Sequence, residues 1–159
     1  MKKLNFILAI IFIMVSLSGC ALQDPKYINL STKPNNHYYT DEIHRKILNN
    51  ESFKLYVFNT NLYKSIEVSS DENIIIENFI QSLVSDNYLD ENVENKEPYK
   101  IKIVFKDAKF LIKVFNNNTI SISPWDGNYK EDVISIKDLP LAYNLYDFCT
   151  HIENKPLER

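Results

Sequence analysis

Glycine is the residue in shortest supply, with only Gly19 and Gly127 among 159 residues. Phosphate-binding loops, dinucleotide fingerprints and the strained serine turn of α/β-hydrolases need glycine where the backbone approaches a ligand or adopts a positive φ. Two isolated glycines cannot supply such loops. The sequence therefore argues against all three classes of site.

Histidine is also scarce, with His37, His44 and His151 and no HExxH-like spacing. A general base needs an orienting partner within hydrogen-bond reach, and we identify no local pattern that supplies one. All three are predicted to be surface histidines, and no enzymatic activity is expected.

Basic residues are fewer than acidic ones: the chain has 18 lysines and arginines and 21 aspartates and glutamates, so its net charge is −3. Nucleic-acid binding draws most of its affinity from a basic stripe that neutralises phosphates. No such stripe is present, so a nucleic-acid partner is not expected.

Long apolar runs are absent after the first 19 residues. The chain opens with Met1, Lys2 and Lys3, continues through ten apolar residues at 6–15, and ends this segment with small residues up to Gly19. This order is typical of a secretory signal, and its apolar core is shorter than the roughly 20 residues of a spanning helix. An uncleaved membrane anchor is the alternative. The rest of the chain is predicted to be soluble.

The residues Leu17-Ser18-Gly19-Cys20 resemble the lipobox of bacterial lipoprotein precursors. The resemblance implies that residues 1–19 are a signal peptide and that Cys20 becomes the first residue, carrying a diacylglycerol and fatty acids such as palmitate. Removal of the leader would leave a net charge of −5. Membrane attachment would then depend on the lipid and not on a polybasic patch.

Cysteine is limited to Cys20 and Cys149, so lipidation of the first leaves the second without a partner for a disulfide or a zinc site. His151 follows Cys149 by two residues, but residues two apart on a helix point about 200° away from each other. Cys149 is instead predicted to pack in the core.

Residues 20–39 contain Pro25 and Pro34 and are predicted to be a tether, in which 27–30 could add a short edge strand.

Residues 40–159 are predicted to form one α+β domain. A short helix begins at Thr40, and Pro140 opens a last helix with Leu141 and Ala142 on its apolar face. Between these two helices, strands are predicted at 53–58 and 63–68, followed by a helix that Ser69 and Glu72 cap and that runs to Tyr88. Four further strands are predicted at 99–106, 110–115, 120–122 and 133–136. The order is ββα-ββββα, an antiparallel sheet with two amphipathic helices on one face.

The acidic segment after Tyr88 shares one feature with a calcium loop, because Asp90, Asn92 and Glu94 alternate like the first ligands of an EF-hand. Asn95 stands where that loop needs glycine, and Ile101 where it needs glutamate. Neither a metal nor a cofactor is predicted.

The segment 124–129 holds the single tryptophan, Trp125, beside Asp126 and Gly127. Two arrangements are possible. The favoured one folds Trp125 back to plug one end of the sheet, because large aromatic rings favour burial. In the other, Trp125 and Tyr129 project and form an interaction patch. Tyr38, Tyr39, Tyr143 and Tyr146 are further candidates for an exposed interface.

These observations favour a lipid-anchored extracytoplasmic protein at the cell membrane, a non-catalytic binding or envelope-accessory module with a protein or cell-wall partner. Through its leader and Cys20, the chain resembles the small uncharacterised lipoproteins of Gram-positive bacteria. A hydrolase of the cell wall or of a secreted substrate, acting through a carboxylate pair, and an immunity or inhibitor lipoprotein are the alternatives.

Overall fold

The computed structural model describes residues 33–93, 95–126 and 129–155. The predicted leader, the lipobox with Cys20 and the possible strand at 27–30 lie outside these residues. The chain divides into two units, and the second begins at Lys33. Residues 33–39, expected to be tether, therefore belong to the folded unit, which starts earlier than the predicted residue 40.

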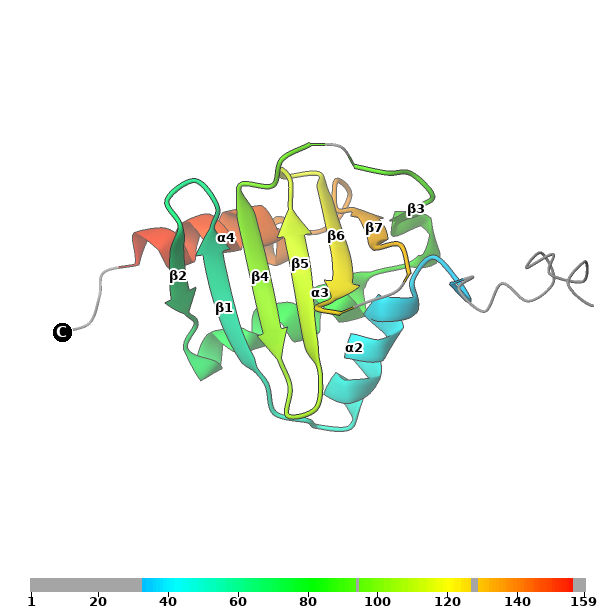
Figure 1. The fold of residues 1–159 in the computed structure, drawn as a ribbon, viewed down its shortest axis with the longest axis horizontal. Coiled ribbons are helices and arrows are strands. Elements are labelled where there is room, and N and C mark those ends of the chain that lie inside the picture. Colours follow the sequence, from blue (N-terminus) through cyan, green and yellow to red (C-terminus); the bar gives the residue numbers. More distant parts are fainter. Residues whose placement is uncertain (1–32, 94, 127–128, 156–159) are drawn as a thin grey trace, which may run out of the picture. The chain divides into compact units, whose positions relative to one another are not determined.

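A seven-stranded antiparallel sheet forms the centre of this unit (Figure 1), in the order β2-β1-β4-β5-β6-β7-β3. Its strands are β1 (Lys54–Asn59), β2 (Lys64–Glu67), β3 (Tyr88–Leu89), β4 (Tyr99–Val104), β5 (Lys109–Val114), β6 (Thr119–Pro124) and β7 (Asp132–Ser135). Strands β4 to β7 are consecutive in the chain and adjacent in the sheet, which confirms the predicted run of four antiparallel strands.

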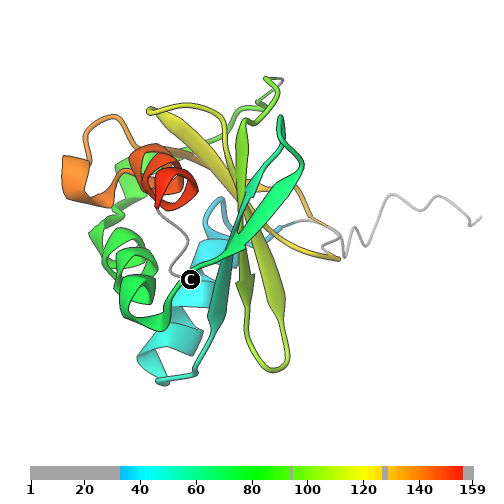
Figure 2. The same ribbon diagram turned by 90° about the vertical axis from the view of Figure 1, so that its left-hand side faces the viewer.

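Three helices cover one face of the sheet (Figure 2), namely α2 (Tyr38–Leu48), α3 (Ile74–Ser82) and α4 (Leu145–Asn154). The α+β class and the ββα-ββββα order are confirmed. Two elements extend that order: the short helix near residue 40 joins the helical layer as a third helix, and β3 follows α3.

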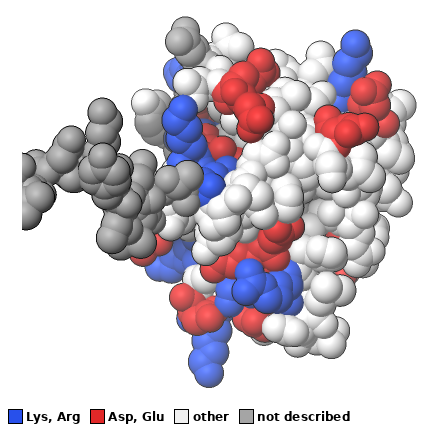
Figure 3. Space-filling model, turned by 90° about the vertical axis from the view of Figure 1, so that its right-hand side faces the viewer, with Lys and Arg blue, Asp and Glu red and all other residues white. Residues whose placement is uncertain are grey.

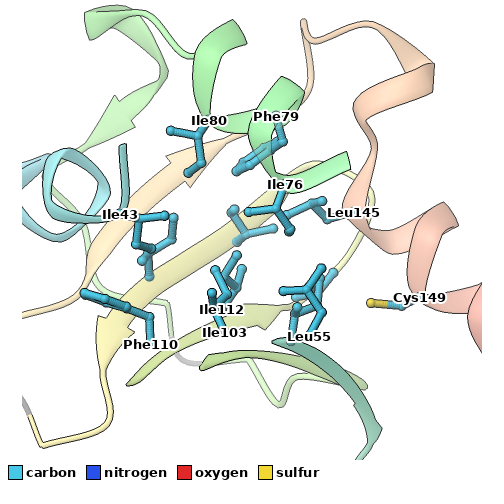
Figure 4. Packing of buried hydrophobic residues seen from close by; sticks show 14 of the residues in the cluster. Ile43, Leu55, Ile76, Phe79, Ile80, Ile103, Phe110, Ile112, Leu145 and Cys149 are labelled. Carbon is cyan, nitrogen blue, oxygen red and sulfur yellow. The ribbon is translucent and has the colours of Figure 1, made fainter. Parts of the chain in front are cut away.

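The alternation of side chains along each strand places the core on the helical face. The register aligns Val57, Ile101, Ile112 and Ile122 across four strands, and all four are buried. Figure 4 shows how side chains of all three helices meet buried side chains of the sheet, Ile112 among them. The labelled helix residues are Ile43 of α2, Ile76, Phe79 and Ile80 of α3, and Leu145 and Cys149 of α4. Burial of this apolar surface is the main force that holds the two layers together.

Helix α3 ends at Ser82 and not near Tyr88 as predicted, since Leu83 adopts an extended backbone. Asn87 then holds the chain in its new direction. Its side-chain oxygen accepts the Val84 N–H at 2.8 Å, and its amide donates to the Ser135 carbonyl at 3.2 Å. These bonds bring Tyr88 alongside β7, where β3 pairs.

Two predicted helix starts also differ in detail. The Ser69 hydroxyl donates to the Glu72 carboxylate at 2.8 Å and makes no capping bond to the backbone, and a 3-10 turn precedes α3. Near the end of the chain Leu141 lies in a 3-10 turn and is 81% exposed, so its expected place on the apolar face was wrong. Helix α4 begins only after Asn144, whose side chain accepts the N–H groups of the first turn.

Cys149 is fully buried, which confirms its predicted place in the core. Burial raises the pKa of its thiol well above the usual value, and the nearby Glu153 charge adds to this. A thiolate is the reactive form of cysteine, so this thiol is inert in the folded protein.

Candidate functional site

The face of the sheet opposite the helices carries no layer of its own within the described residues (Figure 2). The register places Tyr56, Lys102 and Leu111 side by side on this open face, one from each of β1, β4 and β5. The next row aligns Phe58 with Lys100. Aromatic, aliphatic and basic side chains thus alternate across the open face.

These side chains enclose a groove of about 510 Å³. It is lined by residues from four adjacent strands and the segment after β6: Tyr56, Phe58, Ser65, Lys100, Lys102, Leu111 and Trp125. Four of the seven are large apolar or aromatic residues. A groove of this composition is typical of a binding surface more than of a solvated sheet face.

Trp125 lines the groove, and 62% of its surface is exposed. Its backbone N–H donates to the Lys109 carbonyl at 2.9 Å, and the Lys102 ammonium lies 5.0 Å from the ring centroid. This distance allows a cation–π interaction. The backbone of Trp125 is therefore tied to the start of β5, while its exposed ring is contacted by the Lys102 ammonium.

The favoured prediction, that Trp125 plugs the end of the sheet, is wrong, and the register explains why. Strand β6 continues to Pro124, two residues beyond its predicted end, and Pro124 pairs with the buried Phe110. Successive side chains of a strand point to opposite faces, so Trp125 is directed to the open face.

Tyr129 has different neighbours. Its ring centroid lies 5.7 Å from that of Tyr38 and 6.4 Å from that of Tyr39, and its N–H donates to the Tyr39 hydroxyl at 3.0 Å. Tyr39 is 2% exposed, so it is a core residue and not the surface tyrosine that was expected. The structure places Trp125 in the groove and Tyr129 against α2.

Two lysines of the open face have no carboxylate partner within the described residues. Lys54 pairs with Glu67 and Lys100 with Glu97, each at 2.9 Å, and Lys113 pairs with Glu131. Lys102 and Lys109 form no ion pair among the residues that are described, and both lie beside Trp125. The groove therefore carries a local positive charge on a chain whose net charge is negative.

A second hollow, of about 330 Å³, lies between α2 and the segment that follows α3 and includes His37, Asp41 and His44 in its lining. His37 Nδ1 is 2.7 Å from an Asp41 oxygen, so the expectation that no histidine has a local orienting partner was wrong. Their separation of four residues was the signal that could have revealed this contact. Their side chains are 34% and 50% exposed, so water weakens the pair.

Asp132 is a fully buried carboxylate at the start of β7. One oxygen accepts the Thr40 N–H at 2.7 Å and the Thr40 hydroxyl at 2.8 Å, and the other lies 2.5 Å from the Lys33 ammonium. Burial raises the pKa of Asp132, and its contacts with Lys33 and Thr40 oppose that rise. This cluster joins the first residue of the unit and the start of α2 to the sheet, and its role is structural.

The remaining surface features are less distinctive. At the end of the molecule near α2, Figure 3 shows acidic and basic side chains interspersed without an area of a single sign. Among the described residues, no group of three or more histidines, cysteines or carboxylates is arranged to hold a metal ion. No helix in the described part of the chain is both long and apolar enough to cross a membrane.

Comparison with known proteins finds one solved relative and one family. A crystal structure from Clostridium perfringens, described as a "Putative Lipoprotein", is 29% identical with a TM-score of 0.72, and the match covers 78% of this chain and 100% of that one. No curated protein matches the chain. Residues 33–149 match a family model described as a domain of unknown function, DUF4883. Because this match spans most of the chain, the protein belongs to the DUF4883 family.

Proposed function

We propose that this protein is a lipoprotein anchored through Cys20 to the outer face of the cytoplasmic membrane, where the groove of its open sheet face binds a partner and no reaction is catalysed. The charged, apolar and small-residue segments of the leader and the residues Leu17 to Cys20 support the anchoring. The similarity to the Clostridium perfringens protein supports it independently.

The exposed ring of Trp125, which lies in the groove lining, is the observation that carries the binding function. Fully burying a large apolar side chain is worth about 2–3 kcal/mol, and this ring leaves most of that free energy available to a partner. Single exposed apolar residues are common, but Trp125 is continuous with Tyr56, Phe58 and Leu111. Clusters with a central tryptophan dominate the energetics of many interfaces.

The anchoring is tested by replacing Cys20 with alanine. Cells that express the full chain are labelled with radioactive palmitate, and the wild-type protein is expected to incorporate the label and to sediment with membranes. The Cys20→Ala protein should incorporate none, because the diacylglycerol and the further acyl chain both depend on that residue. Equal labelling of the two proteins would contradict the assignment.

The binding function is tested by cross-linking from the groove. A photoreactive amino acid at position 111 should produce a discrete adduct in intact cells, and Trp125→Ala should abolish it without lowering the melting temperature. Leu141 is the matched control position, because it is 81% exposed but lies in a 3-10 turn that contacts α3, one of the helices on the other face of the sheet. The adducted protein, once identified and purified, should bind the wild-type chain and not the Trp125→Ala chain. An adduct that survives Trp125→Ala, or that forms equally from position 141, would show that the groove is not the binding site.

A further inference from the structure

We infer that the partner of the groove is an extended protein segment that carries both acidic and large apolar side chains. This inference rests on the proposed function and specifies its ligand. It is drawn from the chemistry of the groove lining, from the charges around it and from its extent across the sheet.

The polar groups of the lining favour an acceptor-rich ligand. Lys100 and Lys102 contribute ammonium groups and Trp125 an indole N–H, which only donate hydrogen bonds, and the other side-chain polar groups are the hydroxyls of Ser65 and Tyr56. No carboxylate or side-chain amide lines the groove. Sugar hydroxyls both donate and accept, so a glycan would find few acceptors here, whereas a carboxylate matches the ammonium groups.

The charges around the groove favour an acidic ligand. Lys100 is already paired with Glu97, but Lys102 and Lys109 have no carboxylate partner among the described residues. The Lys102 ammonium lies over the Trp125 ring, and the backbone carbonyl of Lys109 accepts the Trp125 N–H. A ligand carboxylate can contact Lys102 while a neighbouring apolar side chain packs on the Trp125 ring. The net negative charge of the rest of the chain repels acidic molecules elsewhere, so this local charge also selects the orientation of binding.

The extent of the groove indicates the length of the segment. Its lining comes from the four adjacent strands β2, β1, β4 and β5. Strands in a sheet are about 4.8 Å apart, so four strands span about 15 Å. An extended peptide advances about 3.3 Å per residue, so four to five residues cross the groove. Successive side chains of an extended segment point to opposite sides, so an acidic and an apolar residue two positions apart would both face the groove, one toward the lysines and the other toward Trp125 and Leu111.

The experiment is a selection of random peptides by display on the full-length chain, held in non-ionic detergent, followed by affinity measurements on synthetic peptides. Enriched peptides are expected to combine acidic residues with phenylalanine, tryptophan or leucine. Each is compared by fluorescence polarisation with a version in which glutamine and asparagine replace the acids. An oligogalacturonate of similar charge serves as the anionic glycan probe. Lys102→Glu and Lys109→Glu are tested beside Lys137→Glu, an exposed lysine outside the groove lining.

The inference predicts that Trp125→Ala weakens the acidic peptides by about 30-fold, as for a hot-spot residue. Lys102→Glu should weaken them by about tenfold and Lys137→Glu by less than about twofold, because only the first reverses a charge beside the ligand. Enriched peptides that depend on Trp125 but bind equally well without their acids would overturn the inference and leave the proposed function standing. If the oligogalacturonate binds in preference to every peptide, and its binding depends on Trp125, the inference is likewise overturned and the proposed function stands. Peptides that bind the Trp125→Ala chain unchanged would contradict both.

Discussion

Replacement of Lys33 by methionine should destabilise the folded unit strongly. Lys33 is the first residue of the unit, its side chain is 14% exposed, and its ammonium is the only cation recorded beside the fully buried Asp132 within the described residues. Without it the carboxylate keeps only the two donors of Thr40. Removing one partner of a buried ion pair costs about 3–5 kcal/mol. That loss is a large share of the 5–15 kcal/mol by which a typical domain is stable.

A matched variant separates the cost of the orphaned charge from the loss of packing. Lys33→Met combined with Asp132→Asn removes both charges, keeps the shape of the carboxylate, and should recover more than half of the lost stability. The measurement is urea unfolding followed by circular dichroism on the chain without its leader. A free energy of unfolding for Lys33→Met within 1 kcal/mol of the wild-type value would refute the reasoning.

The same pair of variants has a distinct pH dependence. Burial raises the folded-state pKa of Asp132, and loss of Lys33 removes a contact that holds this pKa down. A carboxyl group whose pKa is higher in the folded state than in the unfolded state binds more protons when folded, so its contribution to stability is present at low pH and is lost as the pH rises through the folded pKa. Acidification from pH 7 toward about pH 4, the unfolded pKa of aspartate, should therefore stabilise Lys33→Met relative to the double variant. A constant difference between them across this range would contradict the assignment.

Three further predictions concern single residues. Ile80 is 4% exposed on the core face of α3, so Ile80→Asp should lower the free energy of unfolding by several kcal/mol. Lys102→Asp on the open face should lower it by about 0.5 kcal/mol or less. Equal melting temperatures of the two variants would contradict the assignment of faces. Trp125 should show red-shifted fluorescence that acrylamide quenches efficiently; a blue-shifted, protected emission would mean that the ring is buried. Cys149 should react with a thiol reagent only after the protein unfolds, because burial excludes the reagent and raises the pKa of the thiol; a fast reaction of the native protein would count against this packing.

The sheet could be predicted because its determinants are local and periodic. Tyr99, Ile101 and Ile103 alternate with lysines, and the structure buries these three and leaves Lys100 and Lys102 on the open face. The length of α3 could not be predicted in this way. Its apolar spacing continues beyond Ser82, but Asn87 bonds to the carbonyl of Ser135, a contact with a residue 48 positions away that no local pattern reveals.

The candidate site, like the fold, could be predicted from the sequence only where its determinants are local. Trp125 was identified from the sequence as the distinctive residue of its segment, but its direction depends on how far β6 continues, which is decided by pairing with β5. The neighbours of Trp125 in the groove come from four other strands, so they emerge only from the register. Lys33 and Asp132 are also far apart in the sequence. Their contact depends entirely on the fold, so no local pattern predicts it.

The two edges of the sheet have a consequence for how the protein behaves when many copies are crowded together. The outermost strands, β2 and β3, have four and two residues, and Lys64 and Glu67 place charges at the ends of β2. Short and charged edge strands are poor templates for pairing with a strand of another molecule. A lipid anchor would confine the copies to a surface, where frequent encounters favour such pairing and the aggregation that follows. The short edges of this sheet would make such pairing less favourable.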